Sequence, residues 1–515
     1  MKRLLAVLLL AAMLFSFAAC QPADNTQKPD DNPDEPGQSS LFIDKIPASY
    51  DGAFVDRELV VTVDGNYEYE LYAEEDSKET VDQLVYKRNA ALQARFGVTI
   101  VSDPCTVTGA QDLSSHYNYV RDSLLRMEDN FDLIMLMAYQ TGKLVTGGNY
   151  LDWRDGTYLP ISAGSIKAGN EWWPENINRD CTVAGHQYLA VSDMCLTAME
   201  MCYSVLYNKD LERDYNIARN TFGLNTLYEA VDAGRWTIDS LYSIVKDFYY
   251  DSADAGTTGA VDENDLFGIA VGGGTDTDAW AYACGFRYLN NDGENMPELW
   301  TVTGKTVQAI STLRSIYESK GAYGRTWGDN YIERTQFFVD GHALFDLSTL
   351  EQLKSDVFHE MESDYGVLPY PKYDELQKEY MTGTMDHWTC LSIPLFNIEN
   401  LEMTDVLVEA LSAESCNSVR EAYYESILKH NSTRDSDSVR MIEKIMAGRV
   451  YDLSTYHYAE LSIDNTDNGS LGLFFRRMLG AKNTTDPASQ WNGSDRYVIE
   501  PKLQDLIDDY VYMFS

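Results

Sequence analysis

Residues that could do chemistry are plentiful in this sequence, but none stands in a pattern typical of an active site. The HExxH, GxSxG, Walker and protein-kinase motifs are all absent. Gly272-Gly273-Gly274 follows an apolar strand, yet the third glycine of a dinucleotide-binding fingerprint is missing, so we interpret this segment as a loop. With 81 acidic residues, many carboxylates will lie close together by chance, so carboxylate pairs do not indicate a glycosidase. The sequence therefore predicts no catalytic residue and no cofactor.

Two acidic loops have some of the oxygen ligands that calcium prefers. Residues 251–265 are rich in Asp, but Ala253 and Ala255 occupy positions where a calcium loop needs oxygen. Residues 464–469 read DNTDNG, but Phe475 stands where the bidentate Glu belongs. The eight cysteines include no CxxC pair, which favours neither a zinc site nor a disulfide framework. We interpret both loops as solvated and predict no metal site.

Aromatic residues beside polar ones are the feature that points to ligand recognition. The chain has 35 Tyr, 18 Phe and 9 Trp. Tyr139 precedes Gln140, Trp388 follows Asp386 within two residues, and Trp280 has acidic neighbours. Sugar rings pack their C–H faces on aromatic rings, while their hydroxyls bond to polar side chains such as these. Core packing is the alternative for each aromatic residue.

The N-terminus has the features of a bacterial export signal. Lys2 and Arg3 precede the apolar run Leu4–Ala19, which is shorter than the roughly 20 residues that span a bilayer. The run ends in FAAC, which resembles the lipobox in which the cysteine receives a lipid. We predict a signal peptide at 1–19 and a lipid anchor on Cys20, at the extracytoplasmic face of the cell membrane. An uncleaved anchor and an ordinary secretory signal are the alternatives.

A polar tether and a strong negative charge follow. Residues 21–40 contain almost no apolar side chain, so they cannot form a core; we assign 20–55 to the lipidated cysteine and a disordered tether. The net charge is -41, from 40 basic and 81 acidic residues. This charge repels phosphate backbones and anionic lipids, which excludes nucleic acid as a partner and leaves the lipid anchor as the membrane attachment.

The rest of the chain alternates apolar strands with amphipathic helices. Strands are predicted at 59–63, 98–101, 133–137, 205–207, 267–271 and 343–347. Helices are predicted at 81–96, 113–124, 236–249 and 306–319, and most of the chain from 401 onward is predicted to be helical. Continuous apolar strands separated by helices indicate parallel sheets that are covered on both faces. A chain of 515 residues is expected to form two globular units.

Several segments, in the right order, resemble the solute-binding proteins of carbohydrate ABC importers, the family that includes maltose-binding protein. They are LYNKDL at 206–211, GRWT at 234–237, FVDGHALF at 338–345 and YGVLPYP at 365–371, the last resembling a crossover between lobes. The resemblance implies an α/β, two-lobed, periplasmic-binding-protein-like fold of type II. Crossover strands would join the lobes, the C-terminal region would be helical, and ligand would bind in the cleft.

The resemblance also implies a division of the chain and a set of ligand contacts. It places lobe 1 at 56–192 and 300–350, and lobe 2 at 193–299 and 351–515. The implied contacts in lobe 1 are Tyr139, Gln140, Ser348 and Thr349, and those in lobe 2 are Trp280, Asp386 and Trp388.

One motif of the resemblance looks structural. Trp236 begins a helix that Thr237 would cap, with Ser240 weakening the capping box because the family often has Glu there.

The implied function is the capture of a carbohydrate, expected to be an oligosaccharide, for delivery to the transmembrane subunits of an ABC permease. The protein would be a monomer and not an enzyme. Two alternatives stay open: the same fold binding a peptide or another polar solute, and a surface lipoprotein that acts on glycans.

Overall fold

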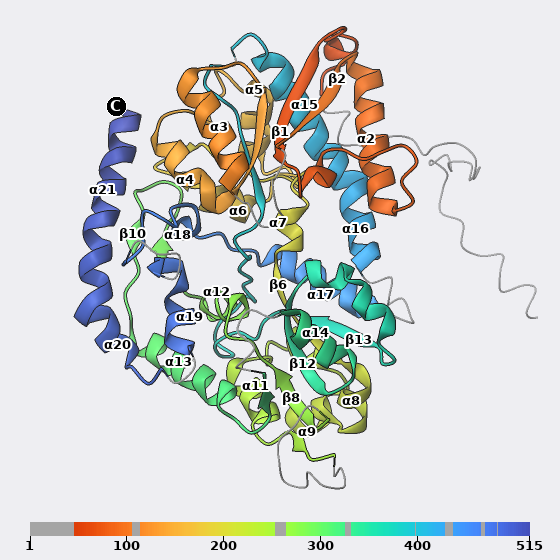
Figure 1. The fold of residues 1–515 in the computed structure, drawn as a ribbon, viewed down its shortest axis with the longest axis vertical. Helices are drawn as coiled ribbons and strands as arrows, with labels where there is room; N and C mark the ends of the chain where they lie inside the picture. Colours follow the sequence, from red (N-terminus) through yellow and green to blue (C-terminus); the bar gives the residue numbers. More distant parts are fainter. Residues whose placement is uncertain are drawn as a thin grey trace, which may run out of the picture. The chain divides into compact units, whose positions relative to one another are not determined.

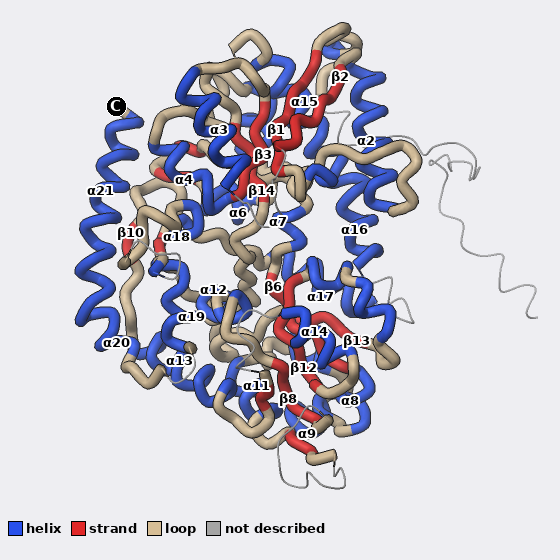
Figure 2. The backbone as a smooth tube through the Cα atoms, in the orientation of Figure 1, coloured by secondary structure: helices blue, strands red, loops and turns tan. Residues whose placement is uncertain are grey.

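The computed structural model describes residues 46–105, 114–252, 264–324, 331–396, 398–427, 436–464, 469–480 and 483–515. The predicted signal peptide and Cys20 lie outside the described residues, as does most of each acidic loop. Within the described residues the main strands gather in two groups (Figure 2). Among the helices in these ranges, none combines the length and the apolar character needed to cross a membrane.

The first sheet forms around the predicted strands of the first lobe. It has the order β14-β3-β1-β2, from β1 (Glu58–Asp64), β2 (Thr99–Cys105), β3 (Leu133–Met137) and β14 (Thr389–Ser392). The first three strands are parallel, and β14 is antiparallel to β3. The connecting helices are α2 (Thr80–Phe96) and α3 (Ser114–Arg126), and every residue of β3 is buried. The predicted parallel pairing is therefore confirmed for β1, β2 and β3, whereas β14 makes the sheet mixed.

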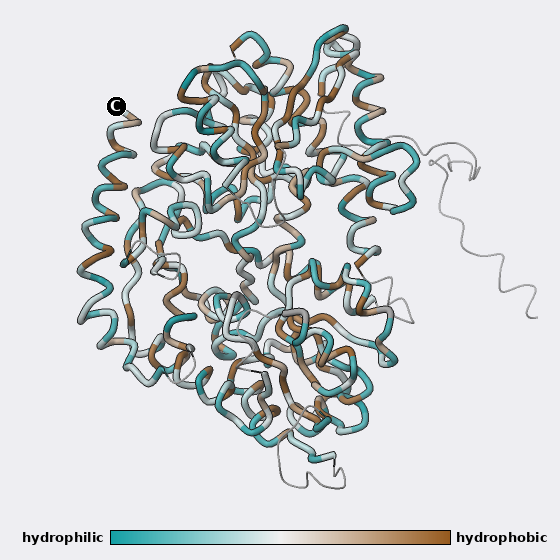
Figure 3. The backbone as a smooth tube through the Cα atoms, viewed as in Figure 1, coloured by the Kyte–Doolittle hydropathy of each residue, from teal (hydrophilic) through white to brown (hydrophobic). Residues whose placement is uncertain are grey.

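The second sheet has the order β11-β8-β12-β6-β13. Its strands are β6 (Tyr203–Asn208), β8 (Leu266–Ala270), β11 (Ala322–Tyr323), β12 (Ala343–Thr349) and β13 (Tyr365–Leu368). The surrounding helices include α11 (Ile238–Val245), α13 (Gly304–Tyr317), α14 (Tyr331–Val339) and α17 (Ser436–Ala447) (Figure 1). The helix predicted at 236–249 ends early, because Tyr249 and Tyr250 form β7 and pair with β8. Hydrophobic residues follow the strands of both sheets (Figure 3).

Strand pairing corrects the predicted division of the chain. The segment 300–350 was expected in lobe 1, but its strand β12 pairs with β6 and β8 of the second sheet. The segment 351–515 was expected in lobe 2, but its strand β14 pairs with β3 of the first sheet. The predicted crossover at 365–371 is also wrong, since it begins with β13, at the edge of the second sheet. Strand pairing joins residues far apart in the sequence, so motif order alone could not decide it.

Three neighbouring backbone segments of the described chain run between the two sheets. Met385 N donates to Met201 O at 2.9 Å, and Tyr203 N donates to Gly383 O at 3.2 Å. The third segment joins on the other side, where Thr382 N donates to Gly448 O and Val450 N to Thr382 O, each at 2.9 Å. We call residues 201–203, 382–385 and 448–450 the crossing strip. A Cβ on Gly383 would overlap the ring of Tyr282, so this approach needs glycine.

Part of the predicted tether is folded. Ile46 and Phe54 are 2% and 3% exposed and belong to the main core. Arg95 donates to Ile46 O at 3.0 Å and forms an ion pair with Asp51 at 2.8 Å. The assignment of residues 46–55 to a disordered tether is therefore wrong, because the side chains of Ile46 and Phe54 are buried in the core of the folded region.

The C-terminal region is helical, as predicted, and contacts both lobes. Its helices include α18 (Leu453–Tyr456), α19 (Phe474–Leu479) and α21 (Arg496–Phe514). Helices α18 and α21 pack on α4 (Ala138–Thr146) of the first lobe, whereas α19 packs on α13 of the second. This region therefore forms part of the walls around the crossing strip.

The GRWT motif is structural, as expected. Trp236 is fully buried, donates from Nε1 to Pro369 O at 2.9 Å and packs on Phe345. Thr237 and Ser240 form a complete capping box at the start of α11, with side-chain to backbone distances of 3.2 and 2.9 Å. The expected weakness at Ser240 is therefore wrong, since its hydroxyl accepts the bond that a Glu would accept.

A buried carboxylate ties the first lobe to the crossing region. Glu70 accepts hydrogen bonds from Thr197 N at 3.0 Å and from the hydroxyls of Thr197 and Thr389 at 3.0–3.1 Å. Thr197 begins α7 (Thr197–Glu200) and Thr389 begins β14. Burial raises the pKa of Glu70 to about 8, and the Thr197 amide opposes the rise. The folded protein therefore binds a proton here more tightly than the unfolded chain does.

We predict that this proton makes stability depend on pH. The folded pKa lies above the unfolded value of 4.5, so the contribution of Glu70 to stability is lost as pH rises from 4.5 to about 8. Glu70→Gln keeps the shape and cannot lose a proton. Its stability relative to the original protein should rise over this range by about 1.4 kcal/mol for each unit of pKa shift. Urea unfolding at several pH values measures the difference.

Glu58→Gln is the matched control, since Glu58 is an exposed carboxyl at the start of β1. The free energy of unfolding of this control should differ from that of the original protein by the same amount across the pH range. A constant difference for Glu70→Gln as well would show that Glu70 stays ionised in the folded state.

Candidate ligand-binding cleft

Two adjoining cavities lie beside the crossing strip, where residues from both lobes meet. The inner chamber, of about 230 Å³, is lined by Tyr67, Met201, Tyr203, Asp276, Arg334, Leu347, Ser348, Thr349, Glu351, Gln352, Met385 and His387. The outer chamber, of about 360 Å³, is lined by Ser114, Tyr117, Tyr139, Gln140, Lys143, Asp386, His387, Tyr456, Tyr458, Ala459 and Glu460. Because His387 lines both chambers, we treat them as one cleft.

The first lobe supplies an aromatic wall directly after its third strand. Tyr139 and Gln140 lie in the first turn of α4, which begins directly after β3, and Gln140 Nε2 donates to Tyr139 OH at 3.1 Å. The Tyr139 ring makes edge contacts with His387, at 5.6 Å between ring centroids, and with Tyr458, at 6.5 Å. All these rings are partly exposed. They can therefore offer faces to a ligand as well as to each other.

The second lobe supplies hydroxyls at the end of β12. Ser348 and Thr349 both line the inner chamber, although the predicted division placed them in the first lobe. Ser348 donates to Thr349 O at 3.2 Å. Among the described residues, Thr349 Oγ1 is buried with no hydrogen-bond partner. This hydroxyl is therefore available to a bound solute or to water.

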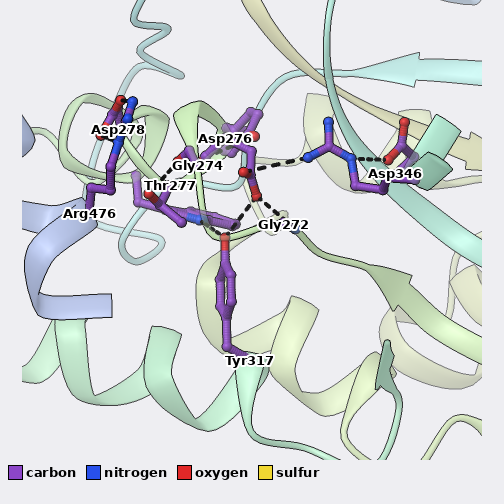
Figure 4. A network of polar contacts seen from close by, with 11 residues as sticks. Gly272, Gly274, Asp276, Thr277, Asp278, Tyr317, Asp346 and Arg476 are labelled. Carbon is purple, nitrogen blue, oxygen red and sulfur yellow. Dashed lines mark hydrogen bonds and ion pairs between the residues drawn. The ribbon is translucent and has the colours of Figure 1, made fainter. Parts of the chain in front are cut away.

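Asp276 lines the inner chamber from the second lobe. Figure 4 shows the polar contacts that hold it. The glycine loop after β8 leads into the short helix η4 (Thr275–Thr277), which carries this residue. Asp276 accepts hydrogen bonds from Gly272 N at 3.3 Å and Tyr317 OH at 3.2 Å. Arg334 lies 3.5 Å from Asp276 and donates to Asp346 at 2.8 Å. The glycine segment is thus a loop, as interpreted, and it positions an acceptor.

The two tryptophans expected in the cleft are core residues instead. Trp280 is 0% exposed, donates to Tyr317 OH at 3.0 Å and packs on Tyr370. Trp388 is 1% exposed and packs on Tyr451 at 4.4 Å between ring centroids. Neither ring lines a chamber, so the prediction that they form its walls is wrong. Trp388 also adjoins β14 of the first sheet rather than the second lobe.

Their polar neighbours line the cleft in their place. Asp386, two residues before Trp388, lines the outer chamber, and its contact with a ligand stays a prediction. Sequence reasoning missed Tyr67, Arg334, His387 and Tyr458 among others. Tyr67 follows β1, so the rule that ligands bind beyond the carboxyl ends of parallel strands could have found it. No sequence signal marks Tyr458, because the C-terminal region reaches the cleft only through tertiary packing.

A larger cavity lies elsewhere and contains none of the predicted site residues. It measures about 960 Å³ and is bordered by the start of α2 and by the helices α16 (Arg420–Ile427) and α17. Glu200, on its border, accepts hydrogen bonds from Tyr69 of the first lobe and from Lys354 of the second, the latter at 2.7 Å. We place the candidate site in the smaller cleft, where strand ends from both sheets converge on one space.

The described residues contain no cluster of three or more His, Cys, Asp or Glu side chains able to hold a metal ion. The seven described cysteines are free thiols, and all but Cys105 are buried. Burial raises the pKa of Cys202 to about 12, which keeps this thiol protonated and unreactive at neutral pH.

We predict that Gly142 shapes the outer chamber. A Cβ on this residue of α4 would overlap Tyr456 O and His457, at the base of the segment that carries Tyr458. Gly142→Ala should therefore cost about 1–3 kcal/mol of stability and displace that segment. Denaturant unfolding measures the loss, and the near-ultraviolet circular dichroism should change because Tyr139 and Tyr458 separate.

Gly164→Ala is the matched control, because Gly164 lies in α5 (Pro160–Ala168) and a Cβ added there would have no atom within 4 Å. It should stabilise the protein by up to about 1 kcal/mol through helix propensity. Equal effects at the two positions would contradict the close approach of α4 and residues 456–457.

Comparison with solved structures shows the fold. The cyclo/maltodextrin-binding protein complexed with maltotetraose aligns with a TM-score of 0.53 at 13% identity, covering 87% of this chain and 97% of that one. UspC from M. tuberculosis aligns with a TM-score of 0.52 at 11% identity, covering 86% and 99%. No protein-family model matches the sequence, and a search of curated proteins finds no match. The predicted α/β, two-lobed, type II solute-binding-protein fold is confirmed.

Proposed function

We propose that this protein captures a carbohydrate, expected to be an oligosaccharide, in the cleft and delivers it to the transmembrane subunits of an ABC importer. One observation carries the proposal: Tyr139 and Gln140 of the first lobe and Ser348 and Thr349 of the second line adjoining chambers that share His387. The cyclo/maltodextrin-binding protein of similar fold is complexed with maltotetraose. On this proposal the chain binds its ligand without converting it.

The composition of the cleft suits a sugar. Tyr67, Tyr139 and Tyr458 offer ring faces for C–H groups, while Gln140 and Asp386 offer hydrogen-bonding groups for hydroxyls. The cleft has few apolar side chains, chiefly Met201, Leu347 and Met385. An apolar ligand would therefore bury little of its surface against apolar groups here. A peptide could also bond to the hydrogen-bonding groups. The three tyrosine rings, however, favour a ligand with several sugar rings, because each sugar ring can pack its C–H face on one tyrosine.

Ligand capture would work by closing the lobes around the crossing strip. A sugar held by Tyr139 on one side and Ser348 on the other bridges both lobes, so it binds the closed form more tightly than the open form. The permease would then receive a surface that exists only when ligand is bound. The crossing strip joins the lobes through three backbone segments, and on this proposal the lobes move about it.

We predict that a glycan stabilises the folded protein. A cognate oligosaccharide at about a hundred times its dissociation constant should raise the free energy of unfolding by roughly 2.7 kcal/mol. Thermal unfolding over a panel of oligosaccharides, peptides and polyamines measures the shift. In calorimetry, Tyr139→Ala should cost about 1–3 kcal/mol of affinity through lost ring contact.

Trp236→Ala is the matched aromatic control: it should lower stability by about 3–5 kcal/mol while the folded fraction keeps its affinity. A shift with peptides or polyamines and none with glycans would contradict the carbohydrate proposal. Turnover of any glycan would favour an enzyme instead.

We also propose that the protein is a monomer held at the extracytoplasmic face of the cell membrane by lipid on Cys20. The apolar run and the FAAC sequence support the anchor. Cys20→Ala should abolish fatty-acid labelling and release the protein from the membrane fraction. Cys105→Ala, at a partly exposed cysteine of the folded region, should leave both unchanged. Retention of the Cys20→Ala variant in membranes would show that the anchor is of another kind.

A further inference from the structure

The walls of the cleft carry more carboxylates than cations. Asp276 and Glu351 line the inner chamber, and Asp386 and Glu460 line the outer one. The only Arg or Lys residues among the described lining residues are Arg334 and Lys143. His387 adds a positive charge only when protonated. A ligand that enters this cleft therefore meets four carboxylates and two permanent cations.

The charge of Arg334 is already compensated within the protein. Its side chain is 8% exposed and donates from Nε to Asp346 at 2.8 Å, while Nη1 lies 3.5 Å from Asp276. Asp346 is fully buried behind the chamber wall. Burial raises the pKa of Asp346 to about 6, and Arg334 opposes this rise, so the pair is formed at neutral pH. Arg334 is thus held by two carboxylates rather than offered to an anionic ligand.

Lys143 is also balanced, since it faces the same chamber as Glu460. Burial raises the pKa of Glu460, and the charge of Lys143 lowers it. On the other side of the cleft, Glu351 and Asp386 lie close to His387, which is 3.8 Å from Asp386. Lys354 and His387 lower the pKa of Glu351 but do not cancel the raising effect of burial and of Glu200. Carboxylates therefore surround the junction of the two chambers.

A further buried acid, Asp278, lies behind this junction. Asp278 forms an ion pair with Arg476 (Figure 4). Burial raises the pKa of Asp278 to about 7; Arg476 opposes the rise, and the neighbouring carboxylates Asp386 and Asp276 add to it. Asp276, Asp278 and Asp386 thus act on one another electrostatically, and Arg334 and Arg476 are each held by one of them.

We propose that the cleft selects neutral and amine-bearing oligosaccharides and rejects glycans that carry carboxylates or sulfates. This proposal rests on the proposed function and adds the charge class of the ligand. A uronate or sulfate would lose its hydration beside Asp276, Glu351 and Asp386 without gaining an uncompensated cation. Neutral hydroxyls donate to these carboxylates at no such cost. An ammonium group would gain charge-assisted hydrogen bonds from the same side chains.

The test uses the full mature chain and glycans of matched length in three charge classes. The neutral probes are cello-, malto- and galacto-oligosaccharides, and the amine-bearing probes are glucosamine oligomers. The anionic probes are oligogalacturonates and sulfated galactan fragments. Calorimetry at low and high salt should find binding only among the neutral and amine-bearing probes. Salt should weaken binding of the amine-bearing probes and leave that of the neutral probes nearly constant. A carboxylated or sulfated probe as the tightest ligand would overturn the proposal.

Absence of binding in every class has a different meaning, because it would contradict the carbohydrate function itself. Binding of all three classes with equal affinity would leave that function intact and refute the charge selection. The two failures are therefore distinguishable.

Variants locate the selection in the cleft. The double variant Glu351→Gln, Asp386→Asn should reduce the ratio of amine to neutral affinity about tenfold. It should also raise the affinity for oligogalacturonate relative to the neutral probe. The matched control is Asp505→Asn with Asp509→Asn, two exposed acids of α21, which removes the same net charge away from the cleft and should leave both ratios unchanged. Equal changes in the two double variants would attribute the selection to net charge and overturn its assignment to the cleft.

Discussion

The hydrogen bonding of the crossing strip is the constraint on which the rest of the molecule depends. Residues 201–203, 382–385 and 448–450 lie far apart in the sequence, yet their backbones pair in one narrow strip. This pairing places β6 in one sheet and β14 in the other. It also brings Met385, Asp386 and His387 to the cleft. The same few backbone hydrogen bonds therefore join the two lobes and hold one wall of the cleft.

This strongly acidic chain buries several carboxylates, and they need hydrogen-bond or ion-pair partners. The partners of these carboxylates also hold together the segments that form the cleft. Glu70 is held by two threonines at the junction of the first lobe and the crossing region. Asp452 accepts from Tyr288 N and Ser454 N, which fixes the C-terminal region against the second lobe. Arg334 joins Asp276 to Asp346. Such groups are costly when unpaired, so each one restrains the segments that supply its donors.

The same internal pairing of charges shapes the chemistry of the cleft. Because Arg334 is engaged by internal carboxylates, the groups left to a ligand are chiefly tyrosine rings, hydroxyls, two amides and acidic oxygens, with Lys143 and His387 beside them. These groups suit a solute that has many hydroxyls and no negative charge. Because they come from both lobes and from the C-terminal region, the cleft can respond to ligand as a whole rather than through one rigid wall.

The sequence by itself determined the local elements and part of the site. The strands at 59–63, 133–137 and 343–347 form as expected, since an apolar run of this kind must be buried wherever it lies. The resemblance to sugar-binding proteins placed Tyr139 and Gln140 in the cleft, just after the third strand, and both line the outer chamber.

Only the tertiary structure decided which sheet each strand joins and which rings reach the cleft. The sheet that β12 joins depends on its pairing with β6, more than a hundred residues earlier in the chain. Trp280 and Trp388 have polar neighbours in the sequence, but Tyr370 and Tyr451, distant in the chain, cover their rings. Tyr458 enters the cleft because Gly142 lets the C-terminal region approach α4. Burial and pairing are set by residues remote in sequence, and that is why local patterns could not supply them.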